Sequence, residues 1–197
     1  MRKANKKPSQ HTGTRALDWV ANNQLLSDFT LAVDGGACFG EWTLPLSELF
    51  DEVYAFEPAP ESRSIWFDKF KGTPNVVMFP YALMDRVHKV ESFKPDNRKP
   101  MASRQVRPRR DGRVLAIPLD KMRLNRCTLL KLDLEGCEIP ALLGASDTIA
   151  RCKPLLIVEF NDKFDFHGTL DDLHKLIKNM GYEHVNTINV DRVYIPR

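Results

Sequence analysis

Short apolar runs and helically spaced apolar residues alternate along most of the chain. The runs predict buried strands, because strands covered on both faces read as nearly continuous hydrophobic segments; they lie at 31–33, 53–56, 76–81, 128–134 and 155–160. Apolar residues spaced three and four apart predict helices at 14–27, 41–50, 60–71, 139–149 and 170–180. This alternation predicts an α/β fold with three layers, in which helices cover both faces of a mostly parallel sheet.

The local signals add detail to this pattern. Thr14 is available as an N-cap for the first helix, and Ile65, Trp66 and Phe70 form the inward face expected for the helix at 60–71. Residues 87–93 alternate apolar and polar positions, which favours an edge strand or a hairpin arm, and 114–119 favours another short strand.

The stretch 29–58, FTLAVDGGACFGEWTLPLSELFDEVYAFEP, reads as strand, glycine turn, helix and second strand. Small residues after Val33 let the chain turn sharply and let a ligand approach the backbone. Glu57 ends the second strand about 20 residues beyond the turn, where related folds bind ribose hydroxyls. Asp34 at the turn would repel a pyrophosphate, so the pattern favours a cationic or zwitterionic ligand such as S-adenosylmethionine.

Two blocks of the sequence resemble one family. VDGGACFGEWTLPLSELFDEVYAFEPAP resembles the cofactor-binding motif of the FkbM-type S-adenosylmethionine-dependent methyltransferases, V-D-x-G-A-N-x-G-x-x-T followed by A-F-E-P. LLKLDLEGCEIPALLGASDTIARCKPLLIVEF resembles the K-x-D-x-E-G-x-E, L-x-G-A and K-P-x-x-x-x-E signatures of that family. With the connecting strands the resemblance covers roughly residues 29–160, and Cys38 departs from it where the family usually has Asn.

This resemblance implies a Rossmann-like class I methyltransferase sandwich whose sheet closes with an antiparallel hairpin at 184–188 and 192–195. It also implies S-adenosylmethionine as cofactor, with the backbone of the glycine turn and Asp34 at the methionine moiety and Glu57 at the ribose. Asp34 could instead cap the following turn, and Asp85 either contacts the adenine or only forms a turn. The predicted cofactor-binding residues are Asp34, Gly35, Gly36, Ala37, Gly40, Glu57 and Asp85.

Three carboxylates, Asp133, Glu135 and Glu159, are the predicted catalytic residues, because they follow strands at the sheet edge where ligands of open α/β folds sit. Asp133 could deprotonate or orient an acceptor hydroxyl, and crowding raises the pKa of neighbouring carboxylates toward neutral pH. Alternatively, Glu135 stabilises a helix N-terminus, Glu159 pairs with Lys131, or the group binds a divalent cation.

Residues 94–113 hold eight Lys or Arg against two Asp, and with three prolines they predict an irregular loop. Such a loop could recognise an anionic hydroxyl acceptor, such as a sugar, nucleotide or natural product, or could merely be solvated. Its predicted substrate-binding residues are Arg104, Arg107, Arg109 and Arg110. A nucleic-acid methyltransferase and a non-catalytic binding protein are the alternative functions, the second supported only by Cys38.

Length and composition favour one folded domain over 14–197, since 43% of the 197 residues are hydrophobic, and the resemblance implies that it is a methyltransferase domain. The first 13 residues, with four basic side chains, predict a mobile tail. The four cysteines show no C-x-x-C pair and no zinc spacing with histidine, so free thiols and no metal are expected. No apolar run is long enough to span a bilayer and the start is not a signal peptide, which predicts a cytoplasmic protein.

Overall fold

The computed structural model describes residues 14–94, 104–161 and 167–197. The predicted tail and residues 95–103 of the predicted basic loop therefore lie outside the described residues. Seven strands form the main sheet: β1 (Leu31–Gly35), β2 (Glu52–Phe56), β3 (Val76–Phe79), β8 (Leu129–Leu132), β9 (Leu155–Glu159), β10 (Tyr182–Ile188) and β11 (Asp191–Pro196).

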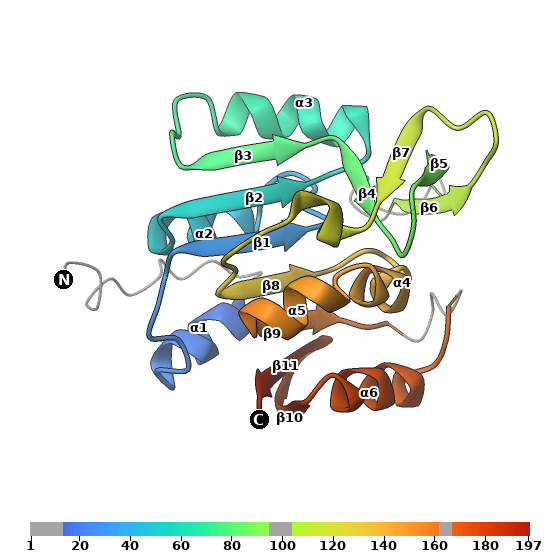
Figure 1. The fold of residues 1–197 in the computed structure, drawn as a ribbon. Helices are drawn as coiled ribbons and strands as arrows, with labels where there is room; N and C mark the ends of the chain where they lie inside the picture. The colour runs from blue at the N-terminus through green and yellow to red at the C-terminus, as the bar shows by residue number, and fades with distance from the viewer. Residues whose placement is uncertain (1–13, 95–103, 162–166) are drawn as a thin grey trace.

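The strand order of the main sheet is β10-β11-β9-β8-β1-β2-β3, with the parallel strands at its centre (Figure 1). β1 runs parallel to β2 and β8, and β9 runs parallel to β8. β11 is antiparallel to both β9 and β10. This topology confirms the predicted mostly parallel sheet with a closing antiparallel hairpin.

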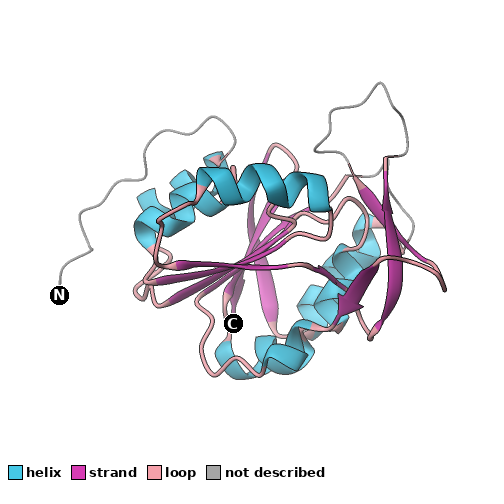
Figure 2. Cartoon of the chain, turned by 90° about the horizontal axis from the view of Figure 1, so that it is seen from above, coloured by secondary structure: helices cyan, strands magenta, loops and turns pink. Residues whose placement is uncertain are grey.

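Six helices cover the sheet on its two faces (Figure 2): α1 (Arg15–Asn22), α2 (Thr43–Leu49), α3 (Pro60–Lys69), α4 (Glu138–Leu143), α5 (Ser146–Cys152) and α6 (Leu170–Asn179). Leu17 of α1 and Leu46 of α2 pack with Leu129 on one face. Helices α4, α5 and α6 pack on the other face, where Ile149 and Ile177 join the second large core. Two apolar cores on opposite faces of one sheet make the three layers that were predicted.

A second sheet of four strands was not predicted. It consists of β4 (Tyr81–Leu83), β5 (His88–Phe93), β6 (Gln105–Pro108) and β7 (Val114–Ile117), in the order β4-β7-β5-β6. β4 is parallel to β7, while β5 is antiparallel to both β6 and β7. This small sheet lies beyond the carboxyl ends of β1, β2 and β8, and a 3₁₀ helix at Leu119–Met122 leads back from it (Figure 1).

Four predicted elements were wrong in their extent. The helix predicted over 14–27 ends at Asn22. The strand predicted over 76–81 ends at Phe79, because Pro80 has no N–H to continue the ladder, and Tyr81 starts β4 instead. Gln105–Pro108 is a strand within the segment predicted to be irregular, and it tolerates Pro108 because β6 is an edge strand. The helix predicted over 139–149 is two helices, which meet at Gly144.

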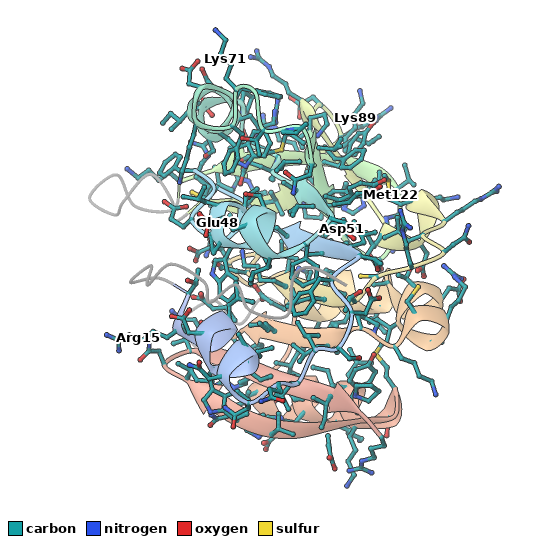
Figure 3. The ribbon with its side chains drawn as sticks, turned by 90° about the vertical axis from the view of Figure 1, so that its left-hand side faces the viewer. Arg15, Glu48, Asp51, Lys71, Lys89 and Met122 are labelled. Carbon is teal, nitrogen blue, oxygen red and sulfur yellow. The ribbon has the colours of Figure 1, made fainter. Side chains whose placement is uncertain are left out.

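Two side-chain predictions were also wrong. Ile65 was expected to face inward, but it is 45% exposed, while its neighbour Trp66 is buried. Thr14 precedes α1 but makes no side-chain capping hydrogen bond. Arg15 of α1 and Lys71, just after α3, point outward from the helical layer (Figure 3). Within the described ranges no helix is long and apolar enough to cross a membrane, and the predicted cytoplasmic location stays a prediction.

Candidate active site

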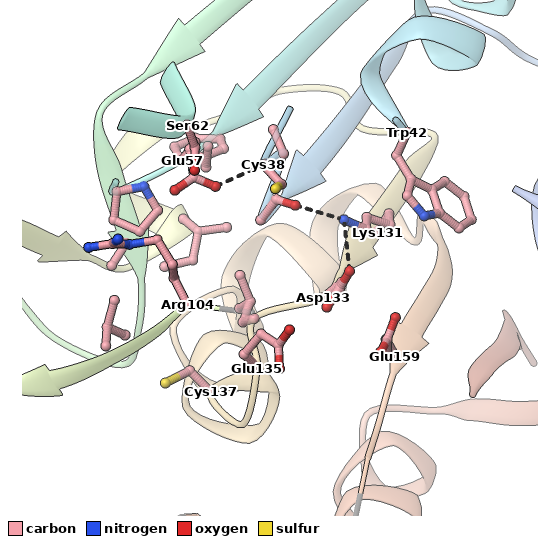
Figure 4. Close-up of a pocket in the computed structure, with 18 of the residues that line it drawn as sticks. Cys38, Trp42, Glu57, Ser62, Arg104, Lys131, Asp133, Glu135, Cys137 and Glu159 are labelled. Carbon is pink, nitrogen blue, oxygen red and sulfur yellow. Dashed lines mark hydrogen bonds and ion pairs between the residues drawn. The ribbon is translucent and has the colours of Figure 1, made fainter. Parts of the chain in front are cut away.

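A cavity of about 260 Å³ opens at the carboxyl ends of β1, β2, β8 and β9 and extends to the second sheet. Three of its walls follow strands of the main sheet: the turn after β1, the segment after β2, and the segment after β8. Glu57 and Arg104 lie toward one end, whereas Trp42, Asp133 and Glu159 lie toward the other (Figure 4). Its polar lining residues are Cys38, Glu41, Glu57, Ser62, Arg104, Lys131, Asp133, Glu135 and Glu159.

The turn after β1 depends on two glycines that pack closely against neighbouring residues. Gly36 has φ +77°, and a Cβ there would lie 1.8 Å from the carbonyl oxygen of Asp133. Gly40 has φ +82°, and a Cβ there would lie 2.2 Å from the ring of Phe70. Glycine is therefore required at both positions by backbone conformation and by space.

Most backbone groups of this turn are already hydrogen-bonded within the protein. The N–H groups of Gly36 and Ala37 both donate to the carbonyl of Phe56, at 3.0 Å each. The carbonyls of Gly35 and Gly36 accept from Lys131 Nζ at 3.2 and 3.0 Å. Gly36 and Ala37 line the cavity, whereas Gly35 and Gly40 do not. The turn therefore shapes the cavity more than it offers free donors to a ligand.

Asp34 and Lys131 form a buried ion pair beneath the cavity. Asp34 is 0% exposed; its Oδ1 accepts from Lys131 Nζ at 3.1 Å and its Oδ2 accepts from Thr43 Oγ1 at 2.6 Å. Burial acts to lower the pKa of Lys131, but the Coulombic attraction of Asp34 and Asp133 outweighs it and raises that pKa. Asp34 does not line the cavity. Its carboxylate instead fixes the lysine that does.

Asp133 and Glu159 are carboxylates that line the end of the cavity away from Glu57 (Figure 4). Asp133 Oδ2 lies 3.8 Å from Lys131 Nζ, and its side chain is 29% exposed. Burial raises the pKa of Asp133, and Lys131 partly opposes this shift. Burial raises the pKa of Glu159 to about 8, and the charge of Asp133 adds to the shift. At neutral pH Glu159 therefore holds a proton while Asp133, beside the ammonium, is the member that ionises first.

Glu57 is held rigidly at the other end. Its Oε2 accepts from the Cys38 N–H at 2.9 Å and its Oε1 accepts from the Ala59 N–H at 2.7 Å. Burial raises the pKa of Glu57, while these two backbone donors lower it. Cys38 has φ +46°, a region that Asn enters more readily than most residues, and burial raises the pKa of its thiol to about 12. Cys38 is therefore a neutral thiol in this wall.

The segment after β8 carries Glu135 into the cavity lining at φ +53°. Glu138 fastens this segment: its Oε1 accepts from the Leu134 N–H at 2.6 Å and its Oε2 from the Gly136 N–H at 3.1 Å. Burial raises the pKa of Glu138 to about 7, although these donors lower it. Glu138 lies in the first turn of α4 and supports this segment.

Between Glu57 and Arg104 the lining is apolar: Phe56, Tyr81, Ala82, Leu83, Val106, Leu134 and Cys137. Arg104 is itself anchored, since its Nε donates to Ser92 Oγ at 3.1 Å and its Nη2 to the Ser92 carbonyl at 3.2 Å. The lining thus has an apolar slot with a carboxylate on one side and a guanidinium on the other.

The comparisons with known proteins agree with this fold. The sequence profile of the Methyltransferase FkbM domain matches residues 34–184. The chain belongs to the FkbM methyltransferase family. A comparison of this chain with curated protein sequences found no match.

Solved structures share the fold of this FkbM domain at low sequence identity. The methyltransferase FkbM from Methylobacillus flagellatus KT has a TM-score of 0.56 and 19% identity, over 85% of this chain and 43% of that protein. The FkbM domain thus spans less than half the length of that relative. Magnesium protoporphyrin IX methyltransferase from Synechocystis PCC 6803, solved with bound SAM, has a TM-score of 0.58 and 13% identity, over 95% and 79% of the chains. An rRNA methylase from Streptococcus thermophilus has a TM-score of 0.54 and 15% identity, over 97% and 95%.

The predicted site residues of the FkbM domain fall into two groups. The cavity brings together Gly36, Ala37, Glu57, Arg104, Asp133, Glu135 and Glu159. Outside its lining lie Asp34, Gly35, Gly40, Asp85, Arg107, Arg109 and Arg110. The exposed Arg107 and Arg109 pair with Glu91 at 3.0 Å each, and Arg109 also pairs with Asp111 at 2.7 Å.

Lys131 has the largest role that the sequence did not reveal. From the sequence, Lys131 was considered only as an ion-pair partner of Glu159. In the structure its ammonium group pairs with Asp34 and Asp133. A lysine in an otherwise apolar buried strand was the available signal, because such a charge needs a partner.

Proposed function

We propose that this FkbM domain binds S-adenosylmethionine in the cavity and transfers its methyl group to a hydroxyl oxygen of an anionic acceptor. The observation that carries the proposal is the division of the cavity into two chemically different ends. An apolar slot beside the fixed carboxylate of Glu57 forms one end, and Asp133 with Glu159 in front of Lys131 forms the other.

The residues present suit this cofactor. The slot between Phe56, Leu83 and Leu134 offers apolar surface to a planar purine. Glu57 accepts one backbone hydrogen bond on each oxygen, and because a carboxylate has about four acceptor positions it can still accept from ribose hydroxyls. The carboxylates at the opposite end complement the positive sulfonium and amino groups.

Bound S-adenosylmethionine supplies an activated methyl group, so the protein has to position the acceptor and remove its proton. Asp133 is the proposed base, because Lys131 stabilises its charged form at the cavity wall. Glu159 lies beside Asp133 in the cavity lining and orients the acceptor through its carboxyl group, and Glu135 borders the same space.

The acceptor is proposed to be a small anionic molecule such as a sugar phosphate, a nucleotide or an acidic natural product. Arg104 supports this, since it lines the cavity and its side chain is only 20% exposed. Arg107 and Arg109 pair with Glu91 and Asp111 at 2.7–3.0 Å, whereas the ion pair of Arg104 with Glu61 is longer, at 3.9 Å. Arg104 and the exposed Arg110 are therefore the stronger candidates for recognition.

Calorimetric titration of S-adenosylmethionine into the wild type, Glu57→Gln and Glu183→Gln tests the cofactor site. Glu57→Gln should weaken binding by roughly 10- to 100-fold, the value of one or two charge-assisted hydrogen bonds. Glu183→Gln, an exposed carboxylate of β10, is the matched control and should bind normally. A folded wild type that does not bind S-adenosylmethionine would overturn the proposal.

Methyl transfer is then followed with methyl-labelled cofactor against a panel of phosphorylated and carboxylated hydroxyl acceptors. Asp133→Asn should keep cofactor binding within a few fold and lose at least about 100-fold in turnover, as expected for a general base. Turnover that survives in Asp133→Asn would remove this residue from the role of base. Equal use of neutral and anionic acceptors would remove the preference assigned to Arg104.

A further inference from the structure

Asp191 places a third carboxylate next to the two at the acceptor end of the cavity. In the antiparallel ladder between β11 and β9, Asp191 is the direct partner of Glu159, so both side chains point to the same face of the sheet. In the parallel ladder between β8 and β9, Leu132 pairs with Val158, and the next residues, Asp133 and Glu159, are neighbours. Asp133, Glu159 and Asp191 thus form a row across three adjacent strands, which we term the carboxylate row.

The carboxylate row runs from the half-buried Asp133 and Glu159 to the buried Asp191, and its acids outnumber the cations beside it. Asp191 is only 8% exposed, and within residues 14–94, 104–161 and 167–197 its carboxylate makes no hydrogen bond or ion pair. Lys131 is shared with Asp34, which lies closer to it than Asp133 does. The guanidinium of Arg192 donates to the carbonyls of Phe160 and Val190. The ammonium of Lys131 and the guanidinium of Arg192 therefore act on four acids, and burial disfavours the ionisation of all four together.

The charged groups that act on the row come from every neighbouring element. Besides the three acids themselves, they are Asp34, Glu41, Lys131, Glu135 and Arg192. Three of these five are acids. The described part of the chain offers no group of three or more His, Cys, Asp or Glu side chains arranged to hold a metal ion. A proton held by a member of the row is a counter-charge that these residues can supply themselves.

We propose that Asp133, Glu159 and Asp191 share protons as one unit, and that binding of the positively charged cofactor expels a proton from this unit into solution. The inference rests on the proposed function. S-adenosylmethionine carries one positive charge more than S-adenosylhomocysteine, the product that remains after methyl transfer. The carboxylate row therefore distinguishes cofactor from product by charge, and Asp191 is a specificity-determining residue that need not touch either ligand.

The pH range in which this happens follows from the two outer members of the row. Burial raises the pKa of Glu159 to about 8 and that of Asp191 to about 6, with the charge of Asp133 adding to both shifts. Between these values the free protein holds protons that the cation displaces, so affinity for S-adenosylmethionine rises with pH and levels off above about 8. Affinity for S-adenosylhomocysteine should change little over the same range.

Isothermal titration of both ligands in two buffers with different ionisation enthalpies measures the protons released per ligand bound. At pH 7 we expect S-adenosylmethionine to release a proton, up to one per cofactor bound, and S-adenosylhomocysteine to release markedly less. Asp191→Asn removes one charge from the row, so proton release should fall and the preference for cofactor over product should drop roughly five- to tenfold. Glu183→Gln, on the same hairpin but exposed, should match the wild type.

The outcomes separate the inference from the proposed function. Equal proton release by the two ligands, or release that is unchanged in a folded Asp191→Asn variant, overturns the inference while the cofactor site stands. No binding of either ligand to the wild type overturns both. Carbon-13 NMR titration of the side-chain carboxyl groups in the free protein tests the proton sharing without any ligand. Asp191→Asn should lower the titration midpoint of Glu159. An unchanged midpoint would contradict proton sharing within the carboxylate row.

Discussion

Lys131 is the residue on which the charges of the site depend. Its Nζ lies within 3.2 Å of three oxygens, one from Asp34 and two from backbone carbonyls, at a position that is 1% exposed. These oxygens are buried or partly buried, and replacing Lys131 would remove the hydrogen-bond donor of all three at once. The ion pair is therefore a structural requirement as well as an electrostatic one.

Lys131→Met should lower the free energy of unfolding by about 3–5 kcal/mol, because it leaves Asp34 charged and buried without its partner. Urea denaturation at pH 7 measures this loss. The double variant Asp34→Asn with Lys131→Met should be less destabilised than Lys131→Met alone, since it removes the uncompensated charge. Lys178→Met, on the exposed side of α6, should change stability by less than about 0.5 kcal/mol. A loss in Lys131→Met no larger than in Lys178→Met would contradict this account.

At the scale of single residues the sequence was informative where strands end. Glu57, Asp133 and Glu159 were predicted from their places at strand ends, and they line one cavity. The sequence could not tell that Asp34 points beneath the cavity to Lys131, because two positions 97 residues apart are joined only by the pairing of β1 with β8. Asp191 was missed for the same reason, since the register of β11 against β9 decides its neighbour.

At the scale of elements, the turn between β1 and α2 is the part with the least room for change. Gly36→Ala should be poorly folded, or lose several kcal/mol of stability, because its Cβ would overlap the backbone of Asp133. Gly72→Ala is a matched control: Gly72 also has a positive φ, +86°, but nothing lies within 4 Å of the added Cβ. It should cost only about 1 kcal/mol, from backbone strain. Comparable unfolding midpoints in urea for the two variants would show that crowding at Gly36 is unimportant.

The order of strands and helices followed from hydrophobic periodicity, but the second sheet did not. β4 has three residues and β6 four, too short for a reliable period, and both β4 and β6 adjoin or contain a proline. Their strand character comes from pairing with β7 and β5. The break between α4 and α5 at Gly144 likewise depends on a contact distant in the sequence. The backbone of Gly144 packs so closely on Met84 that a Cβ would lie 2.1 Å from the Met84 carbonyl oxygen.

At the scale of the whole molecule, buried acids should make stability fall as pH rises. Burial raises the pKa of Glu138 to about 7, that of Glu159 to about 8 and that of Asp191 to about 6. The folded state therefore keeps protons that the unfolded chain releases above about pH 4.5, and stability declines from about pH 5 to pH 8.

The midpoint of thermal unfolding should be roughly 10–20 °C lower at pH 8 than at pH 5.5, corresponding to about 5 kcal/mol. Differential scanning calorimetry at the two pH values measures the difference. Glu159→Gln should reduce it, because glutamine has no proton to lose, whereas Glu183→Gln should leave it unchanged. A midpoint that rises toward pH 8 would contradict the raised pKa values of these buried acids.

The pairing of β1 with β8 also has a consequence for the order in which the chain can fold. Asp34 precedes Lys131 by 97 residues, and the second sheet lies between them in the chain. During synthesis from the N-terminus, β1 can pair with β2 as soon as both have emerged, but the buried side of Asp34 stays without its cation until β8 appears. A nascent chain that ends before residue 131 therefore carries Asp34 without its cation, on the open edge of a sheet made of β1, β2 and β3. Completion of the core is tied to a late step of translation, and the same ion pair that organises the site marks the point at which the sheet can close.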